Sequence, residues 1–337
     1  ARLQVIPGFS LCFIEMLMDD YLQTGDLAFL RSQLPIAYGI VQAFEAKITD
    51  HGMVGALGWW EYADWTDAWG GSEGVPTAVV HGEESALHNL HFVYVLRLMV
   101  RLLLKLGEAE NAARMEALAD RVSDSVRKNC YDPQRGMFRE GRCTREFSQH
   151  SQVWAVLGGV SKGEEARRIL THALEEKDVI PCSFCMQFYL FRALEEAGMY
   201  ERTLPLWDAW KSLLPLHLST IPETPTWPRS DCHAWGALAL YEFTAKWLGV
   251  DMGEPGWATV RICPRPDLIC NLAGTVTTPR GPVYVSWMRK DIHRIHLWIQ
   301  APPEAACEAR LPDGKALVLE KGSFDGEVDM DLMRFSV

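Results

Sequence analysis

The first 250 residues form a nearly continuous series of helix-like segments, and this series constrains the fold more than any other feature of the chain. Apolar residues recur every three or four positions, and glycines or capping residues separate one segment from the next. The pattern predicts about nine helices of roughly 10–24 residues each. They are expected at residues 9–22, 26–48, 83–106, 108–129, 148–157, 163–176, 183–197, 201–214 and 231–248.

Two kinds of helix alternate in this series. Two segments, 108–129 and 163–176, carry Glu, Arg and Lys along one face, which indicates outer helices. Alternating inner and outer helices are typical of an α/α barrel, whose functional loops emerge at one end, before the inner helices. No fixed repeat period or recurring signature is present, which argues against a stack of helical-hairpin repeats. The segments with few charges, expected to be buried on most sides, are 83–106, 148–157, 183–197 and 231–248.

After Gly249 the pattern changes from helical to strand-like. Short alternating runs rich in β-branched residues are separated by turn signals such as Pro-Arg-Gly and Asp-Gly. We expect a small antiparallel β-sandwich at 251–337 behind a helical domain at 1–250. His293 and His296 are three apart on an expected strand and point to opposite faces, so they cannot share a metal. The expected strands are 257–263, 273–277, 281–288, 293–300, 306–311 and 315–319.

The net charge, the length of the apolar runs and the cysteines bear on binding partners, membrane spans and cellular location. A net charge of −11 argues against a nucleic-acid partner, because phosphate binding needs clustered Lys and Arg. No apolar run approaches the roughly 20 residues of a membrane span. The nine cysteines are scattered without framework spacing, which favours reduced thiols and a cytoplasmic location. A homo-oligomer is left open.

Familiar cofactor and metal motifs are absent from the sequence, so we expect neither a cofactor nor a metal. There is no dinucleotide fingerprint, phosphate loop, zinc-protease motif or nucleophile elbow. Cys182 and Cys185 have CxxC spacing, but they lack a second pair and lie in an apolar helix, so they are interpreted as structural. His88 and His91 share a helix face without a carboxylate at matching spacing, which favours a core or ligand-lining role.

A tryptophan-rich loop at residues 57–69, the tryptophan loop, has the composition of a sugar site. Four of the thirteen tryptophans fall within eleven residues, among Glu61, Asp64 and Asp67. Indole faces pack on the C–H faces of a pyranose ring, and carboxylates accept hydrogen bonds from its hydroxyls. We single out Asp64 and Trp65 as ligand contacts. The alternative is a loop folded over the barrel whose tryptophans serve only as packing.

A second rich stretch at residues 220–237, the proline-braced segment, presents Glu223 between two prolines. Trp227, Arg229 and His233 follow within ten residues. Prolines stiffen this segment and remove backbone donors, so it can hold a carboxylate, an imidazole and indole faces in fixed positions. Such a set suits a polar ligand with planar faces, and a sugar fits that description. The alternative is a proline-rich connection with incidental aromatics.

These segments together resemble the inverting α-L-rhamnosidases, a family of bacterial and fungal six-hairpin glycosidases. The resemblance spans nearly the whole chain, and the stretch from Glu223 to His233 is its most specific part. The motifs that carry it are Ile6-Pro-Gly-Phe-Ser10, Asp19-Asp-Tyr-Leu-Gln-Thr-Gly-Asp26, Tyr131-Asp-Pro-Gln-Arg-Gly-Met-Phe138, Trp60-Glu-Tyr-Ala-Asp-Trp65, Pro222-Glu-Thr-Pro225 and Ser230-Asp-Cys-His-Ala-Trp235.

The resemblance implies a mainly α fold, an incomplete (α/α)6 toroid followed by a small antiparallel β-sandwich. It implies hydrolysis of terminal α-L-rhamnosides, with a rhamnoside as the binding partner. Glu223 is expected to be the general base that activates water opposite the leaving group. The expected substrate-binding residues are Trp60, Asp64, Trp65, Trp227 and His233.

An inverting glycosidase also needs a protonated carboxyl roughly 6.5–9.5 Å from the base. The family carries this acid in an Asp-Cys-Pro-x-x-Glu motif shortly before the Ile-Pro-Gly-Phe-Ser segment, and this chain lacks that motif. We therefore expect the acid upstream of Ala1, and the isolated chain to bind rhamnose poorly and hydrolyse little. Glu61 and Asp67 are replacement candidates between which the sequence does not choose.

Two alternatives stay open. The first is another glycosidase on the same barrel, acting on a glucoside, fucoside or uronide. The second is a non-catalytic helical scaffold or carbohydrate-binding protein that uses the tryptophan loop without chemistry.

Overall fold

The computed structural model describes residues 4–69, 73–310, 315–317, 319 and 321–330. The chain folds into two compact units that interleave along the sequence. The helical unit comprises residues 1–18, 27–200 and 222–231, and the strand unit comprises residues 19–26, 201–221 and 232–337. The predicted division into domains at residue 250 stays a prediction.

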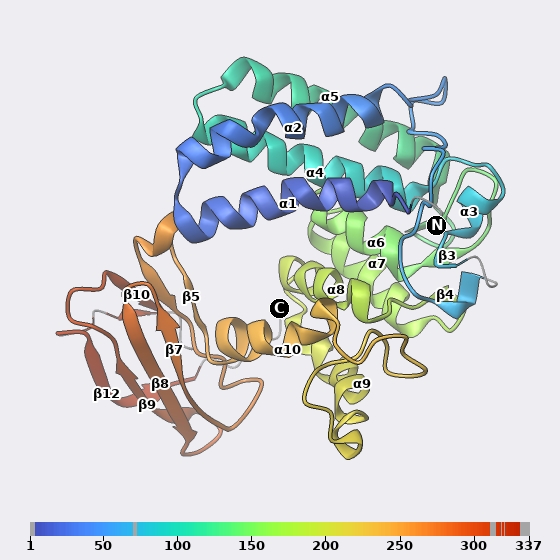
Figure 1. The fold of residues 1–337 in the computed structure, drawn as a ribbon. Coiled ribbons are helices and arrows are strands. Elements are labelled where there is room, and N and C mark those ends of the chain that lie inside the picture. The colour runs from blue at the N-terminus through green and yellow to red at the C-terminus, as the bar shows by residue number, and fades with distance from the viewer. Residues whose placement is uncertain (1–3, 70–72, 311–314, 318, 320, 331–337) are drawn as a thin grey trace. The chain divides into compact units, whose positions relative to one another are not determined.

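Seven helices of nine or more residues dominate the first 200 residues (Figure 1). They confirm the predicted segments between residues 9 and 197, with ends that differ by a few residues. Two shorter pieces, η1 (Asp67–Trp69) and α3 (Thr77–Val80), lie in the long connection between the second and third of them. The seven are α1 (Pro7–Thr24), α2 (Leu27–Glu45), α4 (Ala86–Lys105), α5 (Ala109–Cys130), α6 (Gln149–Leu157), α7 (Gly163–Glu175) and α8 (Phe184–Glu196).

Burial separates these helices into the two predicted kinds. Most side chains of α4 and nearly all of α6 are buried, whereas α5 and α7 bury one stripe and expose a charged face. Helix α4 packs along α5, and α6 packs against α8 (Figure 1). By length and composition α4 could also span a membrane, but 72% of its apolar window is buried inside the protein, as in the core helix of a globular fold.

A serine begins each of three inner helices. Ser85 Oγ accepts a hydrogen bond from His88 N at 3.4 Å, and Ser148 Oγ accepts one from Ser151 N at 3.2 Å. Ser183 caps α8 in the same way. Each cap satisfies a backbone donor of the first helical turn, which is why these serines mark helix starts in the sequence. Strands β3 (Phe147–Ser148) and β4 (Val179–Ile180) pair in parallel and bring the starts of α6 and α8 together.

The last two predicted helices, at 201–214 and 231–248, do not form continuous α-helices, so these two predictions are wrong. Pro205 removes a backbone donor within the first, and the stretch predicted as a buried helix at 231–248 exposes Leu240 and Phe243. A π-helical turn ends that stretch. The observed pieces are η2 (Tyr200–Trp207), α9 (Asp208–Lys211), η3 (Leu214–Leu216), η4 (Ala234–Ala237), α10 (Leu238–Tyr241) and η5 (Glu242–Trp247).

The strand unit contains two four-stranded sheets, in the orders β11-β10-β6-β5 and β12-β9-β8-β7. Strands β6 and β10 pair in parallel, so the prediction of a purely antiparallel arrangement is wrong at that pair. Leu311, the last residue of the strand predicted at 306–311, and Val318, inside the strand predicted at 315–319, lie outside the described residues. The strands are β5 (Val250–Met252), β6 (Val260–Ile262), β7 (Asn271–Thr278), β8 (Gly281–Arg289), β9 (Arg294–Gln300), β10 (Cys307–Arg310), β11 (Ala316–Leu317) and β12 (Ser323–Asp329).

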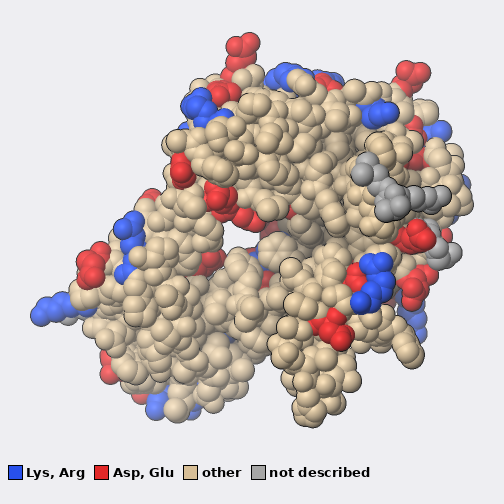
Figure 2. All heavy atoms as spheres, viewed as in Figure 1, with Lys and Arg blue, Asp and Glu red and all other residues tan. Residues whose placement is uncertain are grey.

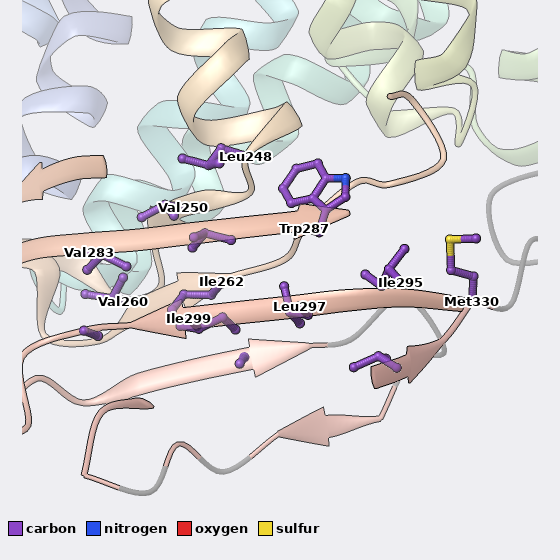
Figure 3. Packing of buried hydrophobic residues seen from close by; sticks show 14 residues of the cluster. Leu248, Val250, Val260, Ile262, Val283, Trp287, Ile295, Leu297, Ile299 and Met330 are labelled. Atoms are coloured by element: carbon purple, nitrogen blue, oxygen red, sulfur yellow. The ribbon is translucent and has the colours of Figure 1, made fainter. Parts of the chain in front are cut away.

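Alternate residues of the strands fill one apolar core, seen from close by in Figure 3. Val283, Val285 and Trp287 of β8 point inward, and the intervening side chains are more exposed, as the period of two requires. Strand β9 follows the same alternation. On the face shown in Figure 2, Lys and Arg are interspersed with Asp and Glu and do not gather into a basic tract.

Candidate active site

The tryptophan loop folds largely on itself. Tyr62 and Trp65 have ring centroids 4.9 Å apart, and Trp60 lies 5.5 Å from the Tyr62 ring and 6.0 Å from the Trp65 ring. Tyr62 and Trp69 are buried, whereas Trp59 is 56% exposed. The packing alternative therefore holds for Trp69, and the group of Trp60, Tyr62 and Trp65 remains as an aromatic wall.

A return of the chain at Gly74 holds this wall in place. Ala63 N donates to Gly74 O at 2.8 Å, and Trp60 Nε1 donates to Glu73 O at 3.1 Å. Gly74 has a φ of +77°, and a Cβ built there would lie 2.6 Å from the Tyr62 ring. Only glycine combines this backbone angle with so close an approach.

Asp64 is fully buried and joins the tryptophan loop to two inner helices. Its Oδ2 lies 2.7 Å from His150 Nε2 on α6 and accepts a hydrogen bond from Ser183 N, at the start of α8, at 2.7 Å. Its Oδ1 accepts from Trp65 N at 2.8 Å and from the Ser183 hydroxyl. Donors within the protein thus occupy both oxygens. The observed hydrogen bonds of Asp64 hold the tryptophan loop in place. The predicted contact of Asp64 with a sugar hydroxyl stays a prediction.

Glu223 is held by a bidentate ion pair. Arg229 donates from Nη2 to Oε1 at 2.8 Å and from Nε to Oε2 at 3.2 Å. Glu223 N also donates to Ser230 O at 2.9 Å, which closes the turn between the two residues. The Glu223 side chain is 3% exposed and that of Arg229 66% exposed, so the guanidinium covers the carboxylate from the solvent side. The hydrogen bonds to Glu223 raise the pKa of Arg229, and the guanidinium stays charged.

Arg229 also connects the proline-braced segment to the tryptophan loop. Its guanidinium lies 4.1 Å from the centroid of the Trp65 ring, a cation–π contact. Through this one side chain the structure brings Glu223 and Trp65 into the same site. The sequence places Arg229 in the segment but gives it no role, because its two partners could not be read from spacing.

The other predicted substrate contacts lie in different surroundings. Trp227 is 96% exposed and has a φ of +48° at the tip of its turn. His233 belongs to the strand unit, where its ring centroid lies 4.0 Å from that of Trp235. The predicted roles of Trp227 and His233 stay predictions.

Glu61 is a second carboxyl of the tryptophan loop and is 7% exposed. It accepts hydrogen bonds from Leu57 N at 2.9 Å and Gly58 N at 3.4 Å. Burial raises the pKa of Glu61, against the smaller opposing effect of these two hydrogen bonds. Between Glu61 and Asp67, the raised pKa favours Glu61 as the carboxyl that holds a proton.

Sequence reasoning missed His150 and Ser183 as partners of the site. They lie 86 and 119 residues from Asp64 along the chain, so no local spacing reveals the contact. The one available signal was that both lie at starts of predicted inner helices, where the functional loops of a helical barrel are expected.

Comparisons with known proteins find similarity to rhamnosidases. Residues 249–323 match the family model of the bacterial alpha-L-rhamnosidase C-terminal domain. A GH78 family rhamnosidase of Bacillus sp. GL1 superimposes with a TM-score of 0.79 at 26% identity, over 92% of this chain and 34% of that one. The chain therefore spans about a third of the length of that structure. No curated protein matches the sequence.

Two further solved structures share the fold at lower identity. A rhamnosidase from Klebsiella oxytoca with rhamnose bound has a TM-score of 0.60 at 20% identity, over 70% of this chain and 46% of that one. A Streptomyces avermitilis alpha-L-rhamnosidase complexed with L-rhamnose has a TM-score of 0.66 at 18% identity, over 92% of this chain and 31% of that one.

Proposed function

We propose that this chain is part of an α-L-rhamnosidase and supplies the general-base side of the active site of an inverting glycosidase that releases terminal α-L-rhamnose. The rhamnosidase likeness over most of the chain supports the reaction class. The rhamnose-bound Klebsiella and Streptomyces structures support the substrate class. The single observation that carries the mechanism is Glu223, a shielded carboxylate clamped by Arg229 beside the aromatic wall.

In the proposed reaction Glu223 accepts a proton from a water that attacks the anomeric carbon from the face opposite the leaving group. The adjacent guanidinium favours the charged form of Glu223, which is the form a base needs. The bidentate pair with Arg229 also fixes the orientation of the Glu223 carboxylate.

The aromatic wall would receive the sugar ring. Trp60 and Trp65 present apolar faces suited to the C–H faces and methyl group of rhamnose. Asp64 fixes the backbone that carries Trp65, so its expected contribution is to orient the wall. Exposed Trp227 would contact the substrate from the neighbouring segment.

The general acid completes the proposal. We place it upstream of Ala1, in the motif that the family carries there, and the chain alone should then turn over little substrate. Glu61, with its raised pKa, is the carboxyl of this chain to test if the isolated 337 residues prove active. We also propose a reducing compartment such as the cytoplasm as the working location, because the nine cysteines of the sequence lack the spacing of a disulfide framework.

The test uses a protein of family length that contains this chain and an aryl α-L-rhamnoside. Glu223→Gln should lower the rate about 10²–10⁴-fold, the usual contribution of a general base. Proton NMR of the first product should show the β anomer, because inversion exchanges the configuration. Glu223→Ala with added azide should yield the β-configured glycosyl azide, since the small anion replaces the activated water.

Glu61→Gln is the matched control, a nearby carboxyl that is expected to leave the rate of this longer protein within about threefold of wild type. An α anomer as first product would refute inversion. An unchanged rate in Glu223→Gln would refute the base assignment. Faster hydrolysis of an aryl glucoside, fucoside or uronide would move the substrate class to another sugar.

A further inference from the structure

Three side chains of metal-binding type meet inside the helical unit, apart from the contacts described above. Cys12 and Glu15 lie three residues apart on α1, and His91 lies on α4. One donor atom from each, a thiol sulfur, a carboxylate oxygen and an imidazole nitrogen, lies within 4.8 Å of the other two. Glu15 and His91 are buried and Cys12 is partly buried.

Neighbouring side chains orient these donors. His91 Nε2 lies 2.6 Å from Glu15 Oε1, and Tyr189 on α8 donates its hydroxyl to Glu15 Oε2 at 2.6 Å. The His91 ring stacks on Trp154 of α6 with centroids 4.1 Å apart and planes 14° from parallel. Outer partners that fix the direction of a histidine and a carboxylate are a regular feature of metal sites in proteins.

The donor set selects the kind of ion. A thiolate, an imidazole and a carboxylate are the ligands of tetrahedral Zn²⁺, with room for water in the fourth position. Ca²⁺ and Mg²⁺ prefer six or more oxygen ligands and are disfavoured by sulfur. The charges also agree, because one thiolate and one carboxylate together neutralise a divalent cation and so avoid a net charge in a buried place.

We propose that Cys12, Glu15 and His91 form a zinc site that ties α1 to α4, with Tyr189 as a positioning residue behind Glu15. Binding replaces the hydrogen bond between His91 Nε2 and Glu15 Oε1 by a zinc–nitrogen and a zinc–oxygen bond, and the proton of that hydrogen bond moves to the other ring nitrogen of His91 or to the solvent. The S–H bond of Cys12 breaks, a sulfur–zinc bond forms, and the thiol proton passes to the solvent. The zinc site shares no residue with the proposed sugar site.

Proton release is the signature of this step. A thiol has an ordinary pKa of about 8.5, so it is mostly protonated at neutral pH and has to lose its proton when the metal binds. Calorimetric titration of the metal-free chain with ZnCl₂ in buffers of different ionisation enthalpy should show at least about one proton released per bound zinc, and an affinity that rises with pH.

Cobalt serves as the spectroscopic probe. Titration of the chelator-treated chain with CoCl₂ should give a thiolate-to-cobalt charge-transfer band that saturates at one Co²⁺ per chain and disappears when Zn²⁺ is added. Cys12→Ser and His91→Gln should each weaken binding by more than about 100-fold, and Tyr189→Phe by about 10- to 100-fold. Cys143→Ser is the matched control, an exposed free cysteine whose loss should leave the band unchanged.

Far-UV circular dichroism identifies any variant that fails to fold. If a variant does not fold, proton release on zinc binding by the wild-type chain still tests the proposed site. A band that persists in Cys12→Ser, or zinc binding without proton release, would overturn the proposal. So would the absence of saturable Co²⁺ or Zn²⁺ binding by the wild-type chain.

Discussion

Asp64 is fully buried, and its loss is expected to lower the stability of the helical unit. Replacing it by alanine removes the partner of Trp65 N, Ser183 N and His150 Nε2, of which His150 is fully buried and the other two residues are partly buried. A buried polar group left without its partner costs about 1–3 kcal/mol, and this change leaves more than one such group. We therefore expect Asp64→Ala to lower the free energy of unfolding by about 4 kcal/mol, out of the ~5–15 kcal/mol of a typical protein.

Urea unfolding followed by far-UV circular dichroism measures this change, because the long helices lie mostly in the helical unit. The melting temperature should fall by roughly 8–16 °C. Asp120→Ala is the matched control, since Asp120 pairs with Arg97 at 2.7 Å but is 60% exposed, and it should change stability by less than about 1 kcal/mol. Asp64→Ala and Asp120→Ala with equal unfolding energies would refute the reasoning.

Three further changes test the surrounding site. Arg229→Gln should lower kcat/KM of the family-length protein roughly 10- to 100-fold, with partial rescue by Arg229→Lys; an unchanged kcat/KM would exclude the pairing role. Gly74→Ala should destabilise the chain by at least about 2 kcal/mol in urea unfolding, because it strains the backbone and meets the Tyr62 ring. Burial lowers the pKa of His88 from 6.5 to about 4, so the unfolded state binds more protons between these values. Stability should fall by up to about 3 kcal/mol as pH drops from 6.5 to 4, and His88→Gln should flatten this slope in acid titrations followed by circular dichroism.

The helical part of the fold was largely readable from the sequence because burial and periodicity are local properties. The contrast between α4, with few charged residues, and α7, with one charged face, appears directly in the residue pattern. The failures fall at 201–214 and 231–248, where an apolar period is present but the chain adopts 3-10 and π turns. Pro205 in the segment 201–214 is a sequence signal against a continuous helix, whereas the segment 231–248 contains no proline.

Only the local features of the site could be predicted from the sequence, because its other contacts join segments that are far apart along the chain. Composition identified the tryptophan loop and the position of Glu223, since clustered indoles and a proline-braced carboxylate are visible in a short window. The partners of Asp64 and of His91 come from distant segments, and no spacing rule connects them. The helix of His91 offers no carboxylate at matching spacing, and the carboxylate beside His91 is Glu15 of α1.

Asp64 and Glu223 show why a carboxylate cannot be given its role from residue type alone. Both are almost completely buried, but backbone, hydroxyl and imidazole groups fixed within the fold occupy the oxygens of Asp64, so it has little left to offer a ligand. Glu223 is covered by one long side chain that is itself two-thirds exposed, and that side chain can move without breaking the core. A general base has to be held in direction and yet be accessible to water, and of these two carboxylates Glu223 is the one whose cover can open.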